Sequence, residues 1–435
     1  MRTATLPISS GGPIHHRLSL APKTGCRNPS FATLRGIDWL NFFLADVQTG
    51  VGPFIAIYLA GYRWNEQQVG IALTASSMAG ILTRTPAGWL VDSAHAKRAL
   101  IILGLLAIVA GALTIAFFPS FWPVMTAQAL IGGMSSIFGP AICAISLGVV
   151  GHQLFDYQQG RNQAFNSAGN VAASLSIGLL GYFCSDRSIF FFVAASAIPT
   201  LLALRLIKPK EIDYELARGA EAREDDGKPS SILTLLQDKP LVVFLACAVL
   251  FHFANAAMLP LLGELLSKGQ GRSAMMFMAA CVITTQFTIT ALATWSGRKA
   301  SAWGRKPLLL LGFAVLPIRG ILYTLTHKAA LLVAIQVLDG VGAGIVGVVS
   351  ILVVADLTRG TGRFNLSLGA IAAAVGIGAS LSQTIAGYVV QHFGYNTGFL
   401  FLSAIAAAAL AVLYFFMPET NAAAMPMKTT RRSSC

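Results

Sequence analysis

The sequence predicts an all-α membrane protein in which 12 transmembrane helices form two pseudo-symmetric six-helix bundles. Hydrophobic residues make up 55% of the 435 residues and charged residues only 11%, too few polar side chains for a water-soluble protein of this length. Twelve mostly apolar stretches reach the length of about 20 residues that a helix needs to cross a bilayer. Several sequence features also recur at an offset of about 205 residues.

The predicted spans are separated by short polar breaks, and the longer spans leave room for tilt. They cover residues 37–60, 68–91, 99–118, 122–150, 162–184, 188–207, 240–266, 274–295, 307–326, 330–356, 364–391 and 396–417. The predicted domains are an N-terminal tail (1–36), a first bundle (37–207), a linker (208–239), a second bundle (240–417) and a C-terminal tail (418–435).

Matched residues in the two halves support this division. A parallel repeat of six spans per half is one way to build a binding site near the midplane, between two bundles that can rock against each other. The matches are 128–132 with 336–340, Gly160-Arg161 with Gly362-Arg363, and Gly181-Tyr182 with Gly387-Tyr388.

The positive charges follow the loops. The net charge is +13, but no basic cluster is interleaved with aromatic residues, so we expect no nucleic-acid partner. With the N-terminus in the cytoplasm, the loops on the other side hold only Arg63, Arg187, Lys268, Arg272 and Lys328. This positive-inside pattern predicts a multi-pass protein of the inner (plasma) membrane with both termini in the cytoplasm.

The polar segments and the cysteines suggest no further folded unit. Residues 1–36 contain no acidic residue and many Ser and Thr, as expected of a disordered cytoplasmic tail or, alternatively, a transit peptide. The mixed charges of 208–239 predict a solvated tether with a short helix, with a docking role as the alternative. The six cysteines have no CxxC spacing, so we expect no disulfide and no structural metal.

Two turns predicted on the cytoplasmic side carry related glycine and basic residues, at 88–98 and at 297–306. Here the sequence resembles the major facilitator superfamily (MFS), whose loop between spans two and three carries Gly-x-x-x-Asp-Arg-x-Gly-Arg-Lys, often echoed between spans eight and nine. The resemblance extends from about residue 31 to residue 420 and implies the MFS fold. The residues that match the motif are Gly88, Asp92, Lys97 and Arg98 in the first half, and Gly297, Gly304, Arg305 and Lys306 in the second.

The two copies depart from the family pattern in complementary ways. Ser93 and His95 replace the family Arg and Gly in the first copy, and Ser301 replaces the acid in the second. Where the motif is kept, we expect its glycine to let two helices approach closely and its cations to hold the loop at the anionic leaflet. The resemblance implies a latch that favours one conformation of a rocking cycle; the alternative is a topology signal only.

Other parts of the chain indicate which members of the family the sequence resembles. Residues 41–53 resemble a bacterial branch of permeases, which implies no particular substrate. The family's antiporter signature, a Gly-Pro motif in span five, is missing because residues 169–181 contain no proline. Span four, at 122–150, lacks the Arg of many proton-coupled drug exporters. Both absences argue against a standard multidrug antiporter.

Two acids are predicted within the hydrocarbon, where an ionisable side chain is costly unless it faces a cavity or a partner. Asp46 lies near the middle of the first span, and Asp339 lies in the tenth span beside Gly340. Desolvation can bring the proton affinity of a carboxylate into the range that a proton carrier needs near neutral pH. We expect either acid to line a cavity or to couple transport to protons; a buried acid capped by its neighbours is the alternative.

Two arginines also fall within predicted spans. Arg84 in the second span could pair with an acid or an anionic solute, or its side chain could snorkel to the interface. Arg319 in the ninth span is expected to be peripheral and structural.

Polar uncharged residues supply the remaining candidates. Asn162, Asn166 and Asn170 are spaced four residues apart and form one stripe, which must face a cavity or another helix rather than lipid. His252 and Asn255 in span seven are three apart. We expect Asn166, Asn170, His252 and Asn255 to line a cavity; contacts between helices are the alternative.

These features predict a secondary active transporter of a small solute, because the chain has no Gly-x-x-x-x-Gly-Lys-Ser/Thr phosphate loop for ATP. We expect proton-coupled efflux of an organic compound by alternating access. Uptake of a metabolite is a close alternative, and export of a metal or metal chelate through Asp46 and His252 is a third. A transporter-like receptor or a membrane enzyme is the last, although His252 has no nucleophile at a suitable spacing.

The expected partners follow from this class of protein. They are the lipid bilayer, a small-molecule solute and protons as the coupling ion. We expect no cofactor, no enzymatic activity and a monomer.

Overall fold

The computed structural model describes residues 29–50, 52–93, 96–214, 217, 238–358 and 364–421. Every regular element in these ranges is helical, so the predicted all-α class is confirmed. The first helices are α1 (Phe31–Gly50), α2 (Phe54–Gly61), α3 (Glu66–Ser93), α4 (Lys97–Phe117), α5 (Phe121–Ser135), α6 (Phe138–Phe183), α7 (Ser188–Leu206) and the 3₁₀ turn η1 (Pro209–Glu211). The remainder are α9 (Lys239–Ala256), α10 (Met258–Gln270), α11 (Ser273–Trp303), α12 (Arg305–Leu325), α13 (Ala329–Leu357) and α14 (Phe364–Phe416).

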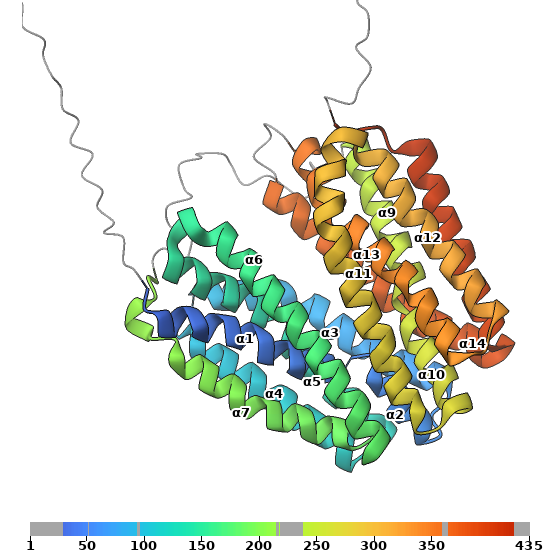
Figure 1. Ribbon diagram of the computed structural model, residues 1–435, viewed down its shortest axis with the longest axis horizontal. Coiled ribbons are helices and arrows are strands. Elements are labelled where there is room, and N and C mark those ends of the chain that lie inside the picture. The colour runs from blue at the N-terminus through green and yellow to red at the C-terminus, as the bar shows by residue number, and fades with distance from the viewer. Residues whose placement is uncertain are drawn as a thin grey trace, which may run out of the picture.

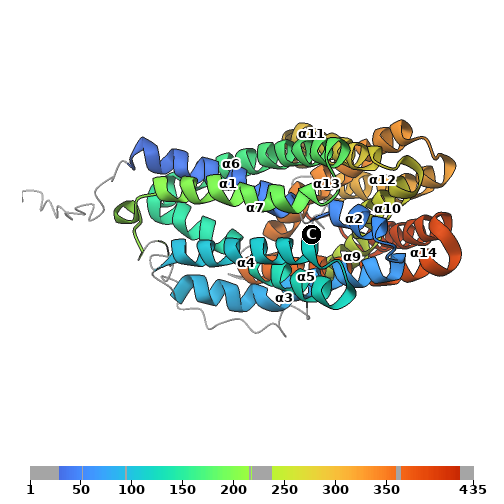
Figure 2. The same cartoon turned by 90° about the horizontal axis from the view of Figure 1, so that it is seen from below.

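The helices lie in two groups, α1–α7 and α9–α14 (Figure 1). Each group has its own apolar core: Tyr58, Phe138 and Phe190 are buried in the first, and Phe244 and Phe313 in the second. The groups diverge toward the ends where α1 begins and α14 ends, and they meet at the opposite ends. There α2 packs against α10, as the view from below shows (Figure 2). We call this meeting place, formed by α2, α3, α10 and the middle of α14, the closed end.

The outer surface is rich in large apolar side chains. Leu103, Trp122, Ile198, Leu325 and Phe415 are each more than half exposed, an arrangement that suits contact with lipid rather than water. Eight helical stretches among the described residues are long and apolar enough to cross a membrane. The stretches α1 and α3, which carry several charged residues, are not among the eight. The protein is therefore a multi-pass membrane protein, and its count of twelve spans stays a prediction.

Helix breaks fall inside some predicted spans, as after α1, and between others, as at Gly151 and Gly394. Pro53 is the N-cap residue of α2 and follows the break after α1. Gly151 in α6 and Gly394 in α14 have φ of 74° and 82°, a left-handed backbone that favours glycine, and each divides one continuous helical stretch into two. The first helix also begins at Phe31, earlier than the predicted start at residue 37. Most of the predicted linker and the greater part of both predicted tails lie outside the described residues.

The break between α9 and α10 is held by side chains of α14. The backbone N–H of Ala257 donates to the Ser382 hydroxyl (3.2 Å), and the Gln383 amide donates to the Ala256 carbonyl (3.0 Å). A broken helix at membrane depth needs such replacement partners for its freed backbone groups. They fix the position of Asn255, the last polar side chain before the break.

Candidate functional site

A cavity of about 340 Å³ lies between the two groups of helices. Both groups contribute to its walls, and two of the helix breaks open onto it. The first group supplies Gly52, Pro53, Leu73, Ser76, Ser77 and Gln128, and the second supplies Asn255, Ala256, Leu259, Pro260, Asp339 and Gln383. We call this space the central cavity. Its volume is that of a site for a small molecule.

The charge in the central cavity comes from an ion pair between α12 and α13. The guanidinium of Arg319 contacts the carboxylate of Asp339, and the Arg319 side chain is 1% exposed. A second Arg319 nitrogen donates to the amide oxygen of Asn255 (2.7 Å), and the Thr285 hydroxyl donates to Asp339 (3.3 Å). The Met258 sulfur lies 3.0 Å from Arg319. A buried charge pair needs such additional hydrogen bonds to offset its desolvation.

The expectation that Arg319 is peripheral was wrong. Its side chain is among the largest fully buried ones in the described part of the chain, and it joins Asp339 to Asn255. The sequence held a usable signal, because an arginine and an aspartate both predicted within the hydrocarbon satisfy each other's charge. The two residues were not paired in the prediction because spacing along the chain does not show that α12 packs against α13.

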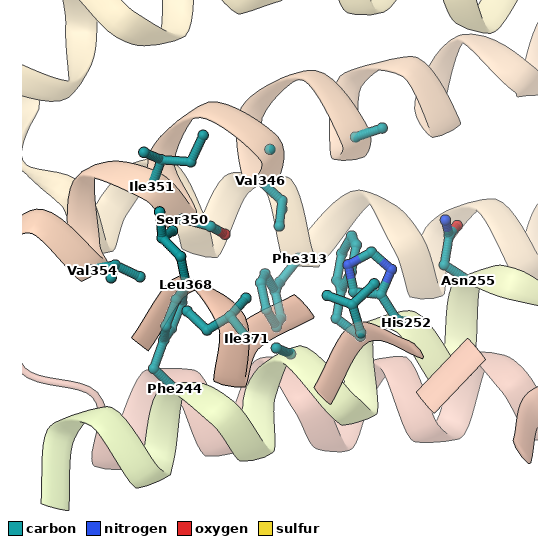
Figure 3. A pocket seen from close by; sticks show the side chains of 15 residues that line it. Phe244, His252, Asn255, Phe313, Val346, Ser350, Ile351, Val354, Leu368 and Ile371 are labelled. Carbon is teal, nitrogen blue, oxygen red and sulfur yellow. The ribbon is translucent and has the colours of Figure 1, made fainter. Parts of the chain in front are cut away.

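An apolar pocket of about 260 Å³ lies within the second group and reaches Asn255 at one end (Figure 3). Three phenylalanines, Phe244, Phe251 and Phe313, line it together with aliphatic side chains of α13 and α14. Its polar side chains are His252, Asn255 and Ser350, of which Asn255 also lines the central cavity. The structure thus places His252 and Asn255 at one pocket, and Asn255 also lines the central cavity together with Asp339.

The asparagine stripe of α6 lies elsewhere, in the first group. Asn166 lines a separate polar pocket of about 240 Å³ against α1. The Asn170 amide donates to Asn166 (3.2 Å), and the Asn162 amide donates to Ser146 (3.0 Å) and Gln159 (2.7 Å). At Asn162 and Asn166 the stripe therefore faces this pocket rather than lipid, and its amides bond to other polar side chains of α6.

Two further candidates lie away from the central cavity or cannot be placed. Arg84 is exposed, and its guanidinium donates to the Ala372 carbonyl of α14 (3.3 Å), a contact between the two groups. The backbone of Asp46 belongs to α1, but its side chain lies outside the described residues. No cluster of three metal-ligating side chains occurs in the ranges that the structure describes, and a metal site at Asp46 and His252 stays a prediction.

The second copy of the loop motif has acidic partners after all. Gly304 has φ of 94° and leads into α12, whose first N–H groups, of Arg305 and Lys306, donate to the Glu419 carboxylate (2.8 and 3.0 Å). The Arg305 guanidinium donates to Asp356 (3.0 Å). Asp356 and Glu419, which are distant from the motif in sequence, thus supply the acidic groups that the motif lacks at Ser301.

The first copy of the motif is held differently. Lys97 is buried and donates to the Val91 carbonyl (2.7 Å), while Arg98 has one nitrogen buried without a partner among the described residues. The Asp92 side chain lies outside the described residues.

At two of the motif glycines, Gly88 and Gly297, this conformation lacks the expected close approach of helices. A Cβ on Gly88 would meet nothing within 4 Å, and one on Gly297 would meet only Val348 at 3.9 Å. Close approaches occur instead at the closed end, where a Cβ on Gly70 would lie 2.2 Å from the Gln383 carbonyl and one on Gly387 would lie 2.5 Å from the Glu66 carbonyl.

Polar contacts seal the closed end. Lys268 of α10 forms an ion pair with Glu66 of α3, and the Tyr395 hydroxyl donates to the same carboxylate (3.0 Å). Thr74 donates to the Ser380 carbonyl (2.8 Å). Helices of the two groups are therefore joined on this side of the central cavity.

Comparison with known proteins identifies the class. The family model described as Major Facilitator Superfamily matches residues 39–301 and 244–432. An uncharacterized MFS-type transporter of Mycobacterium tuberculosis is 44% identical over 389 residues, which is 89% of this chain and 93% of that protein. The chain therefore belongs to the major facilitator superfamily, as its loop motifs indicated. Transporters of this family are not enzymes, so the prediction of no enzymatic activity is confirmed.

More distant likenesses agree with the fold. Multidrug resistance protein 2 of Bacillus subtilis is 26% identical over 140 residues, 32% of this chain and 34% of that protein. The crystal structure of the nucleoside transporter NupG matches with a TM-score of 0.70 at 15% identity, over 88% of this chain and 97% of that one. A crystal structure of a NupG variant matches with a TM-score of 0.74 at 13% identity, over 89% and 99%. At these identities the two structures support the fold alone.

Proposed function

We propose that the protein is a secondary active transporter that exports a small organic solute by alternating access and exchanges it for protons. The observation that carries the proposal is the ion pair of Arg319 and Asp339 at a cavity whose walls come from both groups of helices. Relative motion of the two groups would expose such a cavity to one side of the membrane at a time. The apolar pocket beyond Asn255 supports an organic solute with an apolar part.

The proposal includes a topology. The twelve predicted spans form two six-helix bundles, at residues 37–207 and 240–417, joined by the linker 208–239. The positive-inside pattern places both termini in the cytoplasm, so the central cavity of this structure, sealed at the closed end, faces the cytoplasm. The protein acts as a monomer in the inner membrane, because one chain contributes both walls of the cavity.

Asp339 is the proposed proton carrier. When it is ionised, it neutralises Arg319, so the cavity carries no net charge from the pair and accepts a neutral solute from the cytoplasm. A proton on Asp339 removes the carboxylate partner of Arg319, and the shared partner Asn255 then changes its hydrogen bonds. This rearrangement releases the solute on the outer side. The protonated form then returns to the conformation that faces the cytoplasm. One proton enters for each solute that leaves.

Export is the proposed direction for two reasons. The cavity is sealed at the end that the charge pattern places outside, so this conformation is the one that loads from the cytoplasm. The partial likeness to a protein named for multidrug resistance, over about a third of the chain, points the same way.

Proteoliposomes that contain a pH-sensitive dye test the coupling. Organic solutes from a screen should drive proton movement in the parent, and Asp339→Asn should abolish that movement while solute exchange without a gradient continues. The matched control is Asp356→Asn. Asp356 lies on the same helix as Asp339 and is paired with Arg305, but it lies outside the central cavity. Proton movement at the parent rate in Asp339→Asn would refute the assignment. Solute movement in the same direction as the protons, instead of the opposite direction, would refute export and favour uptake.

A further inference from the structure

Gln128 of α5 stands out among the polar side chains of the central cavity. It is 0% exposed, and neither its amide oxygen nor its amide nitrogen has a hydrogen-bond partner among the described residues. A buried primary amide with no partner destabilises the fold, since it gives up its bonds to water and gains none in return. Such a group calls for a ligand or a role in the working cycle.

The other two amides of the central cavity already have partners. Asn255 accepts from Arg319 (2.7 Å), and Gln383 donates to the Ala256 carbonyl (3.0 Å) at the break between α9 and α10. These two side chains hold the walls in place. Gln128 is left as the one cavity amide, within the described residues, whose donor and acceptor are both free.

The internal repeat provides a comparison within the same chain. Gln336 of α13 corresponds to Gln128 in the matched segments 128–132 and 336–340, and it is equally buried. Its amide oxygen accepts a hydrogen bond from the Tyr323 hydroxyl, and only its amide nitrogen is without a partner among the described residues. The residue at the corresponding position of the first half is Ile115, which offers no side-chain donor. The first half thus keeps the glutamine but lacks its structural partner, at the position that lines the cavity.

Packing prevents Gln128 from relaxing into another environment. One turn further along α5, a Cβ on Gly132 would lie 1.9 Å from the Ser76 carbonyl of α3, so the two helices are in backbone contact. Ser76 itself lines the central cavity. The close contact of α3 and α5 therefore holds the Gln128 side of α5 at the cavity wall.

We propose that Gln128 binds the transported solute through both atoms of its amide, and that the solute is a neutral compound with a neighbouring hydrogen-bond donor and acceptor, such as a carboxamide or a lactam. A primary amide pairs with such an edge through two parallel hydrogen bonds, as glutamine does with adenine in DNA recognition. A neutral solute is expected because Asp339 already neutralises the charge of Arg319. The apolar remainder of the solute extends past Asn255 into the pocket of Phe244, Phe251 and Phe313.

This inference rests on the proposed function, but its test measures binding and not transport. Purified full-length protein in detergent is melted with and without a set of aryl carboxamides and lactams, of which benzamide is the smallest, and with their ketone analogues, in which acetophenone replaces benzamide. Carboxamides should raise the Tm of the parent, and ketones should not. If no carboxamide raises the Tm of the parent more than its ketone analogue does, the assigned solute class is wrong.

The variant Gln128→Leu distinguishes a binding role from a structural one. It should melt at or above the Tm of the parent in the absence of solute, because it removes an unpaired buried amide, while carboxamide affinity falls about 10- to 100-fold. The matched control Gln336→Leu should lower the Tm, because it leaves the Tyr323 hydroxyl without its acceptor, and should keep carboxamide affinity near that of the parent. A Tm loss in Gln128→Leu as large as in Gln336→Leu, or unchanged carboxamide affinity, would overturn the proposal.

The two proposals can fail separately. Carboxamide binding that depends on Gln128, without any proton movement in liposomes, would refute the transport mechanism and leave the binding site standing. If the Gln128→Leu variant transports solutes with proton coupling as well as the parent does, the binding role of Gln128 is refuted and the transport mechanism stands.

Discussion

The two halves of the molecule share their packing but differ in their chemistry. Gly132 and Gly340 correspond in the repeat, and each sits where two helices touch: a Cβ would lie 1.9 Å from the Ser76 carbonyl in the first half and 2.3 Å from the Thr288 side chain in the second. One residue earlier, Ile131 stands in the first half and Asp339 in the second. A repeat therefore preserves the contacts that build each bundle while a single position changes from an apolar core residue to a charged group at the cavity.

Removing one member of the ion pair should give the largest change in stability. Asp339→Leu leaves Arg319 buried without its counter-charge and should cost about 3–5 kcal/mol. The double variant Arg319→Leu/Asp339→Leu should recover most of that loss, since an apolar pair can replace a buried ion pair at little cost. Thermal melting of purified protein measures both changes.

The repeat supplies the control for this prediction. Ile131→Val, at the position that corresponds to Asp339, should cost only about 0.5–1.5 kcal/mol, as expected for one lost methylene in a core. If Asp339→Leu cost no more than Ile131→Val, the ion pair would contribute nothing to the difference between the halves.

Substitution of the paired glycines should affect the halves equally. Gly132→Ala and Gly340→Ala each place a methyl group inside contact distance of a neighbouring helix, and overpacking of this kind costs about 1–3 kcal/mol. Gly139→Ala is the control, because a Cβ there would meet nothing within 4 Å. Equal losses in Tm for the first two variants would confirm the shared packing. A loss in only one of them would show that the halves depend on this contact unequally.

The composition and the loop motifs were enough to predict the fold class and the family. Helices long and apolar enough to span a bilayer leave few alternatives, and the residues around Gly304, Arg305 and Lys306 indicated the superfamily. The breaks at Gly151 and Gly394 lie between predicted spans, but the breaks after α1 and after α9 lie inside single predicted spans and were not predicted, because a long apolar stretch does not reveal an interruption within it.

The candidate site was only partly accessible from the sequence. Asp339, His252 and Asn255 were expected at a cavity because polar side chains are costly in lipid, and the structure brings Asp339 and Asn255 together through Arg319. Arg319 was assigned to the periphery because the ninth span was expected to be peripheral, and spacing along the chain does not show which face of α12 packs against α13. Gln128 was noticed only as part of the repeat, since its lack of a partner depends on the three-dimensional surroundings of its amide.

A smaller effect concerns the glutamates that follow each half. Glu211 and Glu419 occupy corresponding positions, and each accepts a backbone N–H at the start of a helix of its own half: from Ser30 before α1 (3.0 Å) and from Arg305 at the start of α12 (2.8 Å). Hydrogen bonds from Thr33 and Ser30 lower the pKa of Glu211 to about 2, from an ordinary value of 4.5. Because the folded state holds the ionised form more tightly, this contact stabilises the fold above pH 4.5.

The contribution of Glu211 should therefore disappear as the pH falls from 4.5 toward 2. Glu211→Gln keeps the size of the side chain but removes the charge, so the parent should melt slightly above the variant at pH 6, and the difference should shrink as the carboxylate is protonated. Melting curves of both proteins from pH 6 to the lowest pH that the detergent permits measure this difference. A Tm difference that does not change with pH would show that the charge of Glu211 does not stabilise the contact between η1 and the start of α1.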